Sequence, residues 1–277
     1  MNTFVNSTTI LAGGIGLVLL GAGVGFASLG IASGSKVLSQ PLAEPLNGAT
    51  SAKVEISAGS GNLAVDPLAS EGTLLASGTL EYPEKQAAPT RTRSWNSGQE
   101  TFSIQAGSYR QSGFHFPWQA CNGLINWQIH LNPAVRMDLT THSGGGNLNL
   151  NLAEMSLSRV AADTGGGNVE LVLPANASDL SVNAKTGGGN VTVEVGEGIT
   201  GSSTILAKSG AGNVTVRVPS GVAVRVQASS GMGKKLMDAS LTQVDQSTYQ
   251  TPGYETAANK IEITVSSGAG NVSVITR

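Results

Sequence analysis

The chain has 277 residues, enough for one or two domains. Its 16 Lys and Arg residues and 18 Asp and Glu residues give a formal net charge of −2, which provides no electrostatic attraction for nucleic acid or for anionic lipid. The 37 glycines are clustered rather than placed at every third position, which excludes a collagen-like chain, and the single cysteine, Cys121, excludes an intrachain disulfide.

The N-terminal region predicts a membrane anchor. Residues 1–9 form a short tail, and Ile10–Ala32 is an uncharged apolar run, which is long enough to cross a bilayer as a helix. A cleaved signal peptide and a buried helix are the alternatives, but no Lys or Arg precedes the run as it does in a signal peptide. G-x-x-x-G pairs that begin at Gly21 and Gly30 would let two such helices approach closely. We therefore expect a single-pass membrane protein that can form a homo-oligomer.

Residues 33–49 contain Pro41 and Pro45 and are typical of a linker. The orientation of the anchor has to be judged from the residues around it. Lys36 is the one cation close to the span, and the positive-inside rule then favours a cytoplasmic folded domain. A composition poor in Lys and rich in Ser, Thr, Asn and Gly favours the opposite side. We expect the folded domain to be extracytoplasmic.

Residues 50–141 begin with a short strand at Lys53–Ile56 and hold most of the aromatic side chains. Strands are also expected at Trp127–Pro133 and Val135–Thr141. The aromatic residues between them predict an end cap for the repeats that follow, because the last apolar layer of a stack would otherwise face water. A second interpretation is a surface for an envelope protein or a glycan, since aromatic and arginine side chains dominate binding interfaces. That partner surface would consist of Arg91, Arg93, Trp95, Phe116 and Trp118. A third interpretation places Phe116 and Trp118 at the membrane surface.

Residues 142–277 contain a repeat in which a glycine-rich corner ending in Asn precedes an alternating apolar strand. Examples are TGGGNVELVL at Thr164–Leu173 and TGGGNVTVEV at Thr186–Val195. The corner asparagines, including one earlier copy, are Asn62, Asn147, Asn168, Asn190, Asn213 and Asn271. From Asn147 to Asn213 they recur at a near-constant period of about 22 residues, and one further period leads to Lys234 in a degenerate copy, SGMGKKL. A period of this kind indicates stacked copies of one unit.

Each unit has two alternating runs, one on either side of its corner, and a period of two residues indicates strands with one buried face. We expect glycine at the corners because a tight reversal needs positive φ, and Asn because it tolerates the left-handed region. Stacked asparagines can also form a hydrogen-bonded ladder. Two topologies fit, a right-handed single-sheet β-solenoid with parallel strands and an antiparallel meander closed into a sandwich or barrel. The near-constant period favours the solenoid, so we predict an all-β fold of this kind.

Residues that could carry chemistry are sparse. His115, His130 and His142 have no Cys or Glu companion at metal-ligand spacing. The corners carry neutral Asn instead of the carboxylates that calcium requires. Outward positions of the repeats are mostly Ser, Thr and Asn, without the clustered Asp, Glu, Lys or Arg of a polysaccharide-cleaving β-helix. We expect no enzymatic activity, no cofactor, no metal and no nucleic-acid partner.

Four segments carry a resemblance to known proteins. They are KVEISAGSGNLAV at Lys53–Val65, WQIHLNPAVRMDLTTHSGGGNLNLNL at Trp127–Leu152, VPSGVAVRVQASSGMG at Val218–Gly233 and GYETAANKIEITVSSGAGNVSV at Gly253–Val274. With them the chain resembles the toast-rack domain family of bacterial envelope-associated proteins. It is also similar to the C-terminal domain of Lia-type proteins, which respond to cell-wall-active antibiotics. The resemblance covers roughly residues 49–277.

This resemblance implies a right-handed, single-sheet β-helix after an N-terminal toast-rack segment, a place at the cell membrane, and no known enzymatic activity. It also implies envelope-stress signalling, although this chain has one apparent span where the Lia-type regulators have several. The family has no established catalytic or binding residues to carry over. The sequence therefore predicts a non-enzymatic protein anchored in the bacterial cell membrane that binds or scaffolds a partner through its sheet. A self-assembling surface protein and a stress-signalling regulator are the alternatives.

Overall fold

The computed structural model describes residues 36–69, 72–96, 99–108 and 125–277. The expected tail (residues 1–9) and membrane span (residues 10–32) lie outside these ranges. Within the described ranges, no helix has the length and apolar character needed to cross a membrane. Described residues fall in one compact unit, Gly34–Arg277. Their regular structure is β apart from a 3₁₀ turn, η2, at Tyr254–Thr256. The predicted all-β fold is confirmed for this part of the chain.

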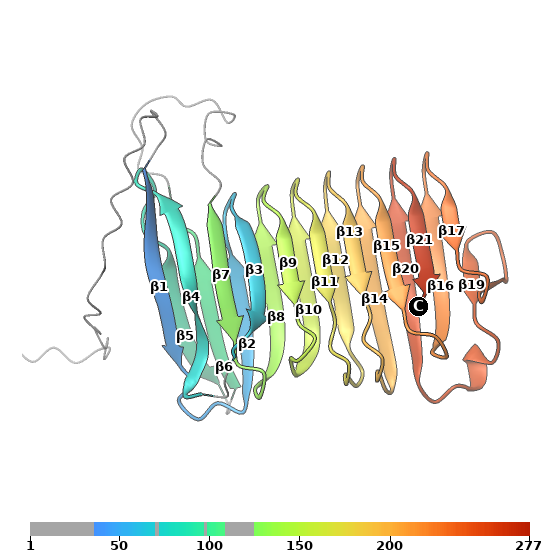
Figure 1. Cartoon of the computed structure of the whole chain (residues 1–277), viewed down its shortest axis with the longest axis horizontal. Coiled ribbons are helices and arrows are strands. Elements are labelled where there is room, and N and C mark those ends of the chain that lie inside the picture. Colours follow the sequence, from blue (N-terminus) through green and yellow to red (C-terminus); the bar gives the residue numbers. More distant parts are fainter. Residues whose placement is uncertain (1–35, 70–71, 97–98, 109–124) are drawn as a thin grey trace, which may run out of the picture. The chain divides into compact units, whose positions relative to one another are not determined.

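The strands form two sheets (Figure 1). In spatial order the first, ten-stranded sheet consists of β1 (Val37–Pro45), β4 (Leu74–Pro83), β7 (Asn126–Leu131), β3 (Asn62–Pro67), β9 (Leu148–Asn151), β11 (Val169–Val172), β13 (Val191–Glu194), β15 (Val214–Val218), β21 (Val272–Thr276) and β17 (Lys235–Met237). The second, eleven-stranded sheet consists of β18 (Thr242–Gln243), β19 (Thr248–Gln250), β16 (Ala223–Ser230), β20 (Lys260–Ser267), β14 (Ser202–Ser209), β12 (Ser181–Thr186), β10 (Leu157–Thr164), β8 (Arg136–Ser143), β2 (Ser51–Ser57), β6 (Gln99–Gln105) and β5 (Thr90–Asn96).

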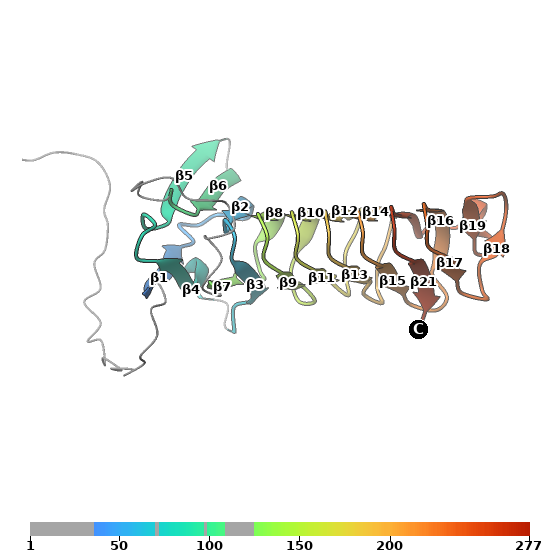
Figure 2. The same cartoon turned by 90° about the horizontal axis from the view of Figure 1, so that it is seen from above.

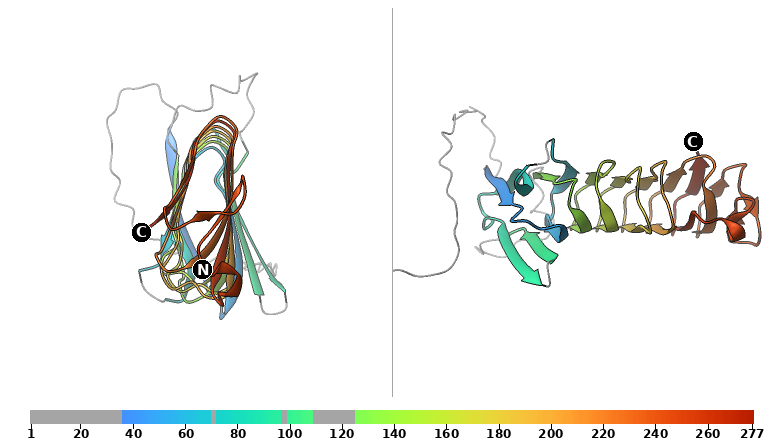
Figure 3. Two further views of the ribbon diagram at one scale, coloured as in Figure 1. Left: turned by 90° about the vertical axis from the view of Figure 1, so that its right-hand side faces the viewer. Right: turned by 90° about the horizontal axis from the view of Figure 1, so that it is seen from below.

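The expectation of a single sheet is therefore wrong. Each corner reverses the chain, so the strand before the corner joins the second sheet and the strand after it joins the first (Figure 2). Seen along the stack, the two strands of each repeat face one another and meet at the corner (left panel of Figure 3). The physical reason is burial: both runs of a repeat have an apolar face, and only two opposed sheets can cover both faces. The right-handed winding stays a prediction.

From β8 to β15 neighbouring strands of each sheet pair parallel and in register, apart from a register shift between Leu157 and Arg159 where β10 meets β8. Val160 on β10 lies opposite Val182 on β12, and Val169 on β11 lies opposite Val191 on β13. Equivalent apolar residues thus form continuous columns, such as the fully buried row Leu150, Leu171, Val193, Val216 and Val274 on the first sheet. This arrangement confirms the solenoid and excludes the antiparallel meander.

The apolar interior continues into the N-terminal part of the unit. Trp127 on β7 pairs in register with Leu63 and is 1% exposed, and its indole nitrogen donates a hydrogen bond to the Glu81 carbonyl at 2.8 Å. Phe102 on β6 is fully buried opposite Val54. Here β4 pairs antiparallel with both β7 and β1, and β5 pairs antiparallel with β6, so parallel stacking ends in two antiparallel edges.

The linker predicted at residues 33–49 is a further correction, because Val37–Pro45 is strand β1. This strand pairs along its whole length with β4 and forms the edge of the first sheet. Pro41 and Pro45 suggested a linker, since proline lacks an amide hydrogen. On an edge strand that loss is tolerated because one side of the strand has no sheet neighbour, and proline there also discourages pairing with another chain.

The stacking order departs from the chain order at the C-terminal end. Repeat spacing alone would place the Lys234 copy directly after the Asn213 copy. Instead, β21 lies between β15 and β17, and β20 lies between β14 and β16. The Asn271 copy is thus inserted one layer inside, and the Lys234 copy is the last layer.

Candidate functional site

The corner asparagines form one line, and each bonds to the next layer through its side-chain oxygen. The Asn147 amide donates to Asn62 Oδ1 at 2.9 Å, and the Asn190 amide donates to Asn168 Oδ1 at 2.8 Å. The same bond joins Asn168 to Asn147, Asn213 to Asn190, Asn271 to Asn213 and Lys234 to Asn271 at 2.8–2.9 Å. The ladder is therefore side chain to backbone, and it ends at Lys234, whose ammonium group can donate a hydrogen bond but cannot accept one.

A second ladder, which the sequence analysis missed, runs through the first residue of each corner. The Thr186 hydroxyl donates to the Gly167 carbonyl of the layer before at 2.7 Å and accepts the amide of Gly189 in its own corner at 3.1 Å. The equivalent residues Ser143, Thr164, Ser209, Ser230 and Ser267 make the same pair of bonds. The signal was present in the sequence: the position is Ser or Thr in every copy from Ser143 onward, and only the earlier copy has Ala58 there.

The corner glycines allow neighbouring layers to approach closely. The expectation that they have positive φ is wrong. None of the glycines in the corners from Gly144 to Gly270 is among the described residues with positive φ; Gly59, in the earlier copy, is. Instead, a Cβ on Gly167 would lie 2.1 Å from the Gly146 carbonyl oxygen, and a Cβ on Gly165 would lie 2.2 Å from that of Gly144. A Cβ on the middle glycine, Gly166, would meet nothing within 4 Å.

This difference explains the variation in the repeat. The middle position holds Ser60, Ala211, Met232 or Ala269 in other copies, whereas the third position is always glycine. The corner asparagines are likewise absent from the described positive-φ residues, so Asn is present for its acceptor oxygen and not for its tolerance of the left-handed region.

Two residues of the predicted partner surface, Arg91 and Arg93 on β5, lie between the two sheets at the N-terminal end. Arg91 pairs with Glu44 on β1 at 3.3 Å, and Arg93 pairs with Glu44 at 3.6 Å and with the fully buried Glu100. Arg91 also donates to the Pro41 carbonyl at 2.6 Å, and Arg93 to the Pro45 carbonyl at 2.8 Å. These contacts tie β5 of the second sheet to β1 of the first.

The remaining residues of the predicted partner surface are not brought together with these arginines by any described contact. Trp95 is 49% exposed near the end of β5. Phe116 and Trp118 lie outside the described residues. The partner surface therefore stays a prediction. Trp95 is its one exposed member among the described residues.

The outward faces of both sheets carry rows of mostly polar side chains, one per layer. On the first sheet the register aligns Asn149, Glu170, Thr192, Thr215 and Ser273. On the second sheet it aligns His142, Asp163, Lys185 and Lys208, where His142 Nδ1 lies 3.2 Å from Asp163 Oδ1 on the exposed surface. Adjacent members of a row are about 4.8 Å apart, which is the spacing of strands in a sheet.

Chemistry-bearing groups do not converge in the part of the chain that the structure describes. There, no group of three or more His, Cys, Asp or Glu residues could hold a metal ion. A cavity of about 460 Å³ lies beside the Val218–Val224 connection, and its lining includes Pro219, Leu241, Pro252 and Ala257 but no ionisable side chain. Its Thr251 hydroxyl already accepts the Val224 amide at 2.9 Å.

Acidic residues near the C-terminal end hold local backbone. The Asp238 carboxylate accepts hydrogen bonds from the Ser240 amide and hydroxyl at 3.0 and 2.8 Å, and from the Thr276 amide of β21 at 3.1 Å. These bonds, above all that from the Ser240 amide, lower the pKa of Asp238 from 3.8 to about 2. Asp245 has its pKa lowered to about 2 in the same way, first by the Ser247 amide. Both carboxylates stabilise turns and contact no basic side chain that would suggest proton transfer.

The comparisons with known proteins agree with this architecture. Residues 33–194 match the family model for the N-terminal domain of toast_rack (DUF2154), and residues 176–274 match that for the C-terminal region of LiaF, of the cell wall-active antibiotics response. No curated protein matches the sequence.

Two solved structures resemble the chain to different degrees. A candidate cell adhesion protein from Clostridium sporogenes is similar, with a TM-score of 0.61 and 19% identity over 87% of this chain and 100% of its own. At that identity the likeness concerns the fold alone. A candidate adhesin from Parabacteroides distasonis has 7% identity and a TM-score of 0.28 over 86% of this chain and 97% of its own, which is too low to support an argument.

Proposed function

The chain belongs to the family defined by the N-terminal domain of toast_rack, and from this we propose that it is a non-enzymatic protein of the bacterial cell envelope. In this proposal it binds or scaffolds an extended partner through the outward faces of its two sheets. The family match over more than half of the chain and the LiaF-type match at its C-terminal end support the envelope location. The similarity in fold to a candidate cell adhesion protein is consistent with a binding role.

The observation that carries the binding role is the alignment of outward side chains into straight rows. Thr192, Thr215 and Ser273 stand in one row on the first sheet, and Ser181, Thr204 and Glu262 stand in one row on the second. A flat surface with a regular spacing suits an extended partner that touches many layers weakly. The described cavity, by contrast, offers no ionisable group for a reaction.

Membrane anchoring through residues 10–32 is part of the proposal. Its support is the long uncharged apolar run at these positions in the sequence. The anchor would hold the sheets close to the cell membrane, with the folded unit on the extracytoplasmic side. Protease treatment of intact cells and of spheroplasts distinguishes the two sides: we expect cleavage of the folded unit in spheroplasts, and protection in both preparations would contradict the extracytoplasmic location.

The binding role is tested with the full chain in detergent and two immobilised probes, purified peptidoglycan and solubilised envelope proteins. We compare the wild type with Thr192→Arg/Thr215→Arg on the first sheet and Ser181→Arg/Thr204→Arg on the second. These side chains point outward, so the fold should persist while the row is blocked. Capture reduced by one pair identifies the binding face. Unchanged capture by both variants would contradict binding through the sheets.

A stress-signalling regulator is the second candidate, because residues 176–274 match the LiaF C-terminal region. Under this alternative a membrane histidine kinase would co-purify with the full chain from solubilised membranes. Recovery of a kinase only from cells treated with a cell-wall-active antibiotic would favour this role over constitutive scaffolding. Self-assembly by end-to-end stacking is the third candidate. Lys234 weighs against it, because it ends the asparagine ladder at the last layer and its side chain offers no acceptor for a further copy.

A further inference from the structure

The inserted layer formed by β20 and β21 occupies a slot between two layers that precede it in the chain. On one side β20 pairs with β14 over eight residues, from Ser202 opposite Lys260 to Ser209 opposite Ser267. On the other side β20 pairs with β16 over eight residues, from Ala223 to Ser230. Ile261, Ile263, Val265, Val272 and Val274 of the inserted layer are fully buried. The C-terminal segment therefore fills a gap that the earlier chain leaves open.

Both walls of the slot recognise the inserted corner by the rules of the repeat. On the inner wall, the Ser267 hydroxyl donates to the Gly212 carbonyl at 2.7 Å, and the Asn271 amide donates to Asn213 Oδ1 at 2.9 Å. On the outer wall, the Ser230 hydroxyl donates to the Gly270 carbonyl at 2.9 Å, and the Lys234 amide donates to Asn271 Oδ1 at 2.8 Å. The slot thus selects a strand–corner–strand segment with Ser, Gly and Asn at fixed positions.

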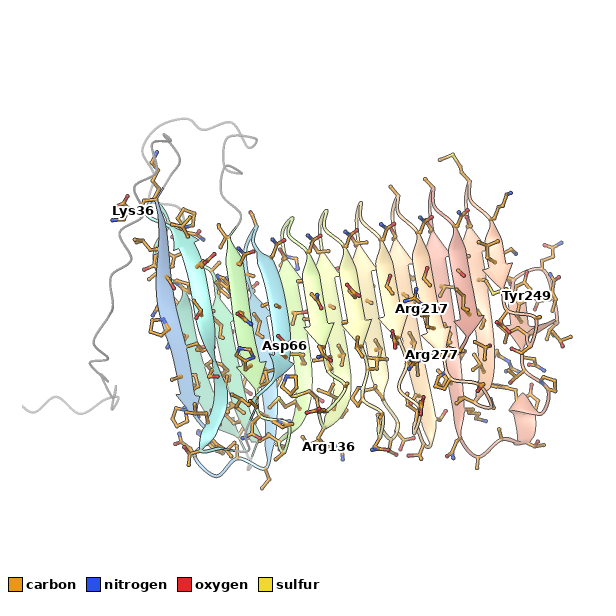
Figure 4. All side chains as sticks on the ribbon, in the orientation of Figure 1. Lys36, Asp66, Arg136, Arg217, Tyr249 and Arg277 are labelled. Carbon is orange, nitrogen blue, oxygen red and sulfur yellow. The ribbon has the colours of Figure 1, made fainter. Side chains whose placement is uncertain are left out.

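The end of the chain fastens the inserted layer further. Arg277 donates through Nη1 to Glu194 Oε1 at 2.5 Å and through Nη2 to the Val195 carbonyl at 2.9 Å. Both acceptors belong to the β13 layer, so the arginine reaches across β15, and Figure 4 shows Arg277 beside Arg217 of that strand. The Arg277 amide and carbonyl also bond to Val218 and Ser220.

What joins this segment to the rest is a single connection from Thr251 to Asn259. It contains η2 and lies outside both sheets. None of the contacts that hold Lys260–Arg277 in the slot depends on which chain supplies the segment. An identical segment from another copy would make the same bonds, which is the condition for exchange of an element between protomers.

We propose that the slot between the β14–β15 and β16–β17 layers is a strand-binding site that accepts Lys260–Arg277 from a second copy of this chain. Two copies then exchange their inserted layers and form a dimer in which each slot is filled by the partner's Lys260–Arg277 segment. The connection Thr251–Asn259 decides between the two forms, because it sets the effective concentration of the chain's own segment at the slot. This inference stands independently of any partner at the outward faces.

Single cysteines in separate copies test the exchange. Thr215 on β15 and Ser273 on β21 are Cα partners with outward side chains, and neighbouring strands about 4.8 Å apart are within reach of a disulfide. Both variants also carry Cys121→Ser. Full-length Thr215→Cys and Ser273→Cys chains are mixed in denaturant, refolded together at high concentration in detergent and oxidised. The matched control mixes Thr192→Cys with Thr215→Cys, which are also Cα partners but lie in layers stacked in chain order.

We expect a covalent dimer on a non-reducing gel from the 215/273 mixture, in several-fold excess over the 192/215 mixture. A chain carrying both Thr215→Cys and Ser273→Cys, refolded at high dilution, should form the disulfide within the monomer, which establishes that the geometry permits it. Equal yields from the two mixtures, or no covalent dimer from the 215/273 mixture when the double variant does form its internal disulfide, would overturn the proposal. Failure of the double variant to oxidise internally would overturn the pairing of β15 with β21 on which the slot depends.

Discussion

The repeats from β8 to β15 and the N-terminal end built from β1, β4, β5 and β6 close the same apolar interior in different ways. In the repeats, glycine corners bring the layers together, and neutral side chains satisfy the backbone. At the N-terminal end the strands become antiparallel, and the buried Glu100, the partly buried Glu44 and the two partly buried β5 arginines join the sheets. Periodic stacking requires glycine at the two tightly packed positions of every corner, whereas an end of the stack requires strands that pair differently.

The largest effect should come from a side chain placed between two corners. Gly167→Ala would put a Cβ 2.1 Å from the Gly146 carbonyl oxygen, and the backbone on both sides is fixed by stacking. We expect a loss of about 4 kcal/mol in the free energy of unfolding, or failure to fold. Chemical denaturation monitored by circular dichroism measures it.

Gly166→Ala is the matched control, because a Cβ at that position meets nothing within 4 Å. Its free energy of unfolding should stay within about 0.5 kcal/mol of the wild type. Equal destabilisation by the two substitutions would show that the corners need conformational freedom rather than space.

The N-terminal end should be most sensitive at Arg93. Arg93→Ala leaves the fully buried Glu100 without its cation, and breaking a buried ion pair from one side costs about 3–5 kcal/mol. Because this end is not continuous with the corner ladders, we expect the free energy of global unfolding to fall by at most about 3 kcal/mol. We also expect proteases to cleave near β5 faster in the variant than in the wild type. Lys53→Ala, which removes the exposed pair with Glu55, is the control and should cost less than about 1 kcal/mol. A small effect of Arg93→Ala would mean that the charges are not needed to join the sheets.

Much of the repeat region could be predicted from the sequence, since Val and Leu at every second position after each corner determine which face is buried. The number of sheets could not, because a period of two on both sides of a corner does not say whether the corner bends or reverses the chain. The role of Asn and the insertion of the Asn271 layer could not be predicted either. Each corner Asn offers its side-chain oxygen to the next layer, and Lys234, in the last layer, donates its amide to Asn271 without offering a side-chain oxygen in turn.

The candidate site divides in the same way. Arg91 and Arg93 suggested a surface because arginine is common in interfaces. Glu44 is 47 residues from Arg91, and no spacing indicated that contact. Glu100 is only seven residues from Arg93 and becomes its partner because β5 and β6 pair as antiparallel strands. The Ser and Thr ladder could have been predicted, because the same residue type recurs before each corner from Ser143 onward. Buried backbone amides need acceptors, and each of these hydroxyls lies three residues before a corner amide whose hydrogen bond it can accept.

Removing one hydroxyl of the second ladder should have a moderate effect. Thr186→Val preserves shape but leaves the buried Gly167 carbonyl and Gly189 amide without that partner, so we expect a loss of about 1–3 kcal/mol. Thr192→Val, at an outward position on β13, should change the free energy of unfolding by about 0.5 kcal/mol or less. Thr186→Ser keeps the hydroxyl and should retain most of the wild-type free energy of unfolding. If Thr186→Ser is as unstable as Thr186→Val, the methyl group matters and the hydroxyl does not.

The smallest effect concerns pH at the C-terminal end. The folded-state pKa of Asp238, about 2, lies below the ordinary value of 3.8, so its contribution is present above about pH 4 and is lost as the pH falls toward 2. Asp238→Asn should therefore destabilise the protein slightly at neutral pH and make its unfolding midpoint less dependent on pH between 4 and 2 than that of the wild type. Parallel pH profiles for the two proteins would contradict the hydrogen-bonded role of this carboxylate.

Hydrogen exchange at the corner asparagines tests the stacking most directly. The amides of Asn168, Asn190 and Asn213 belong to exposed residues, yet each donates to the side chain of the layer before. We expect their exchange, followed by NMR, to be as slow as that of the buried strands, and Asn168→Ala to accelerate exchange at Asn190 while leaving Asn213 protected. Fast exchange of all three amides in the wild type would show that the corners are not held one above another.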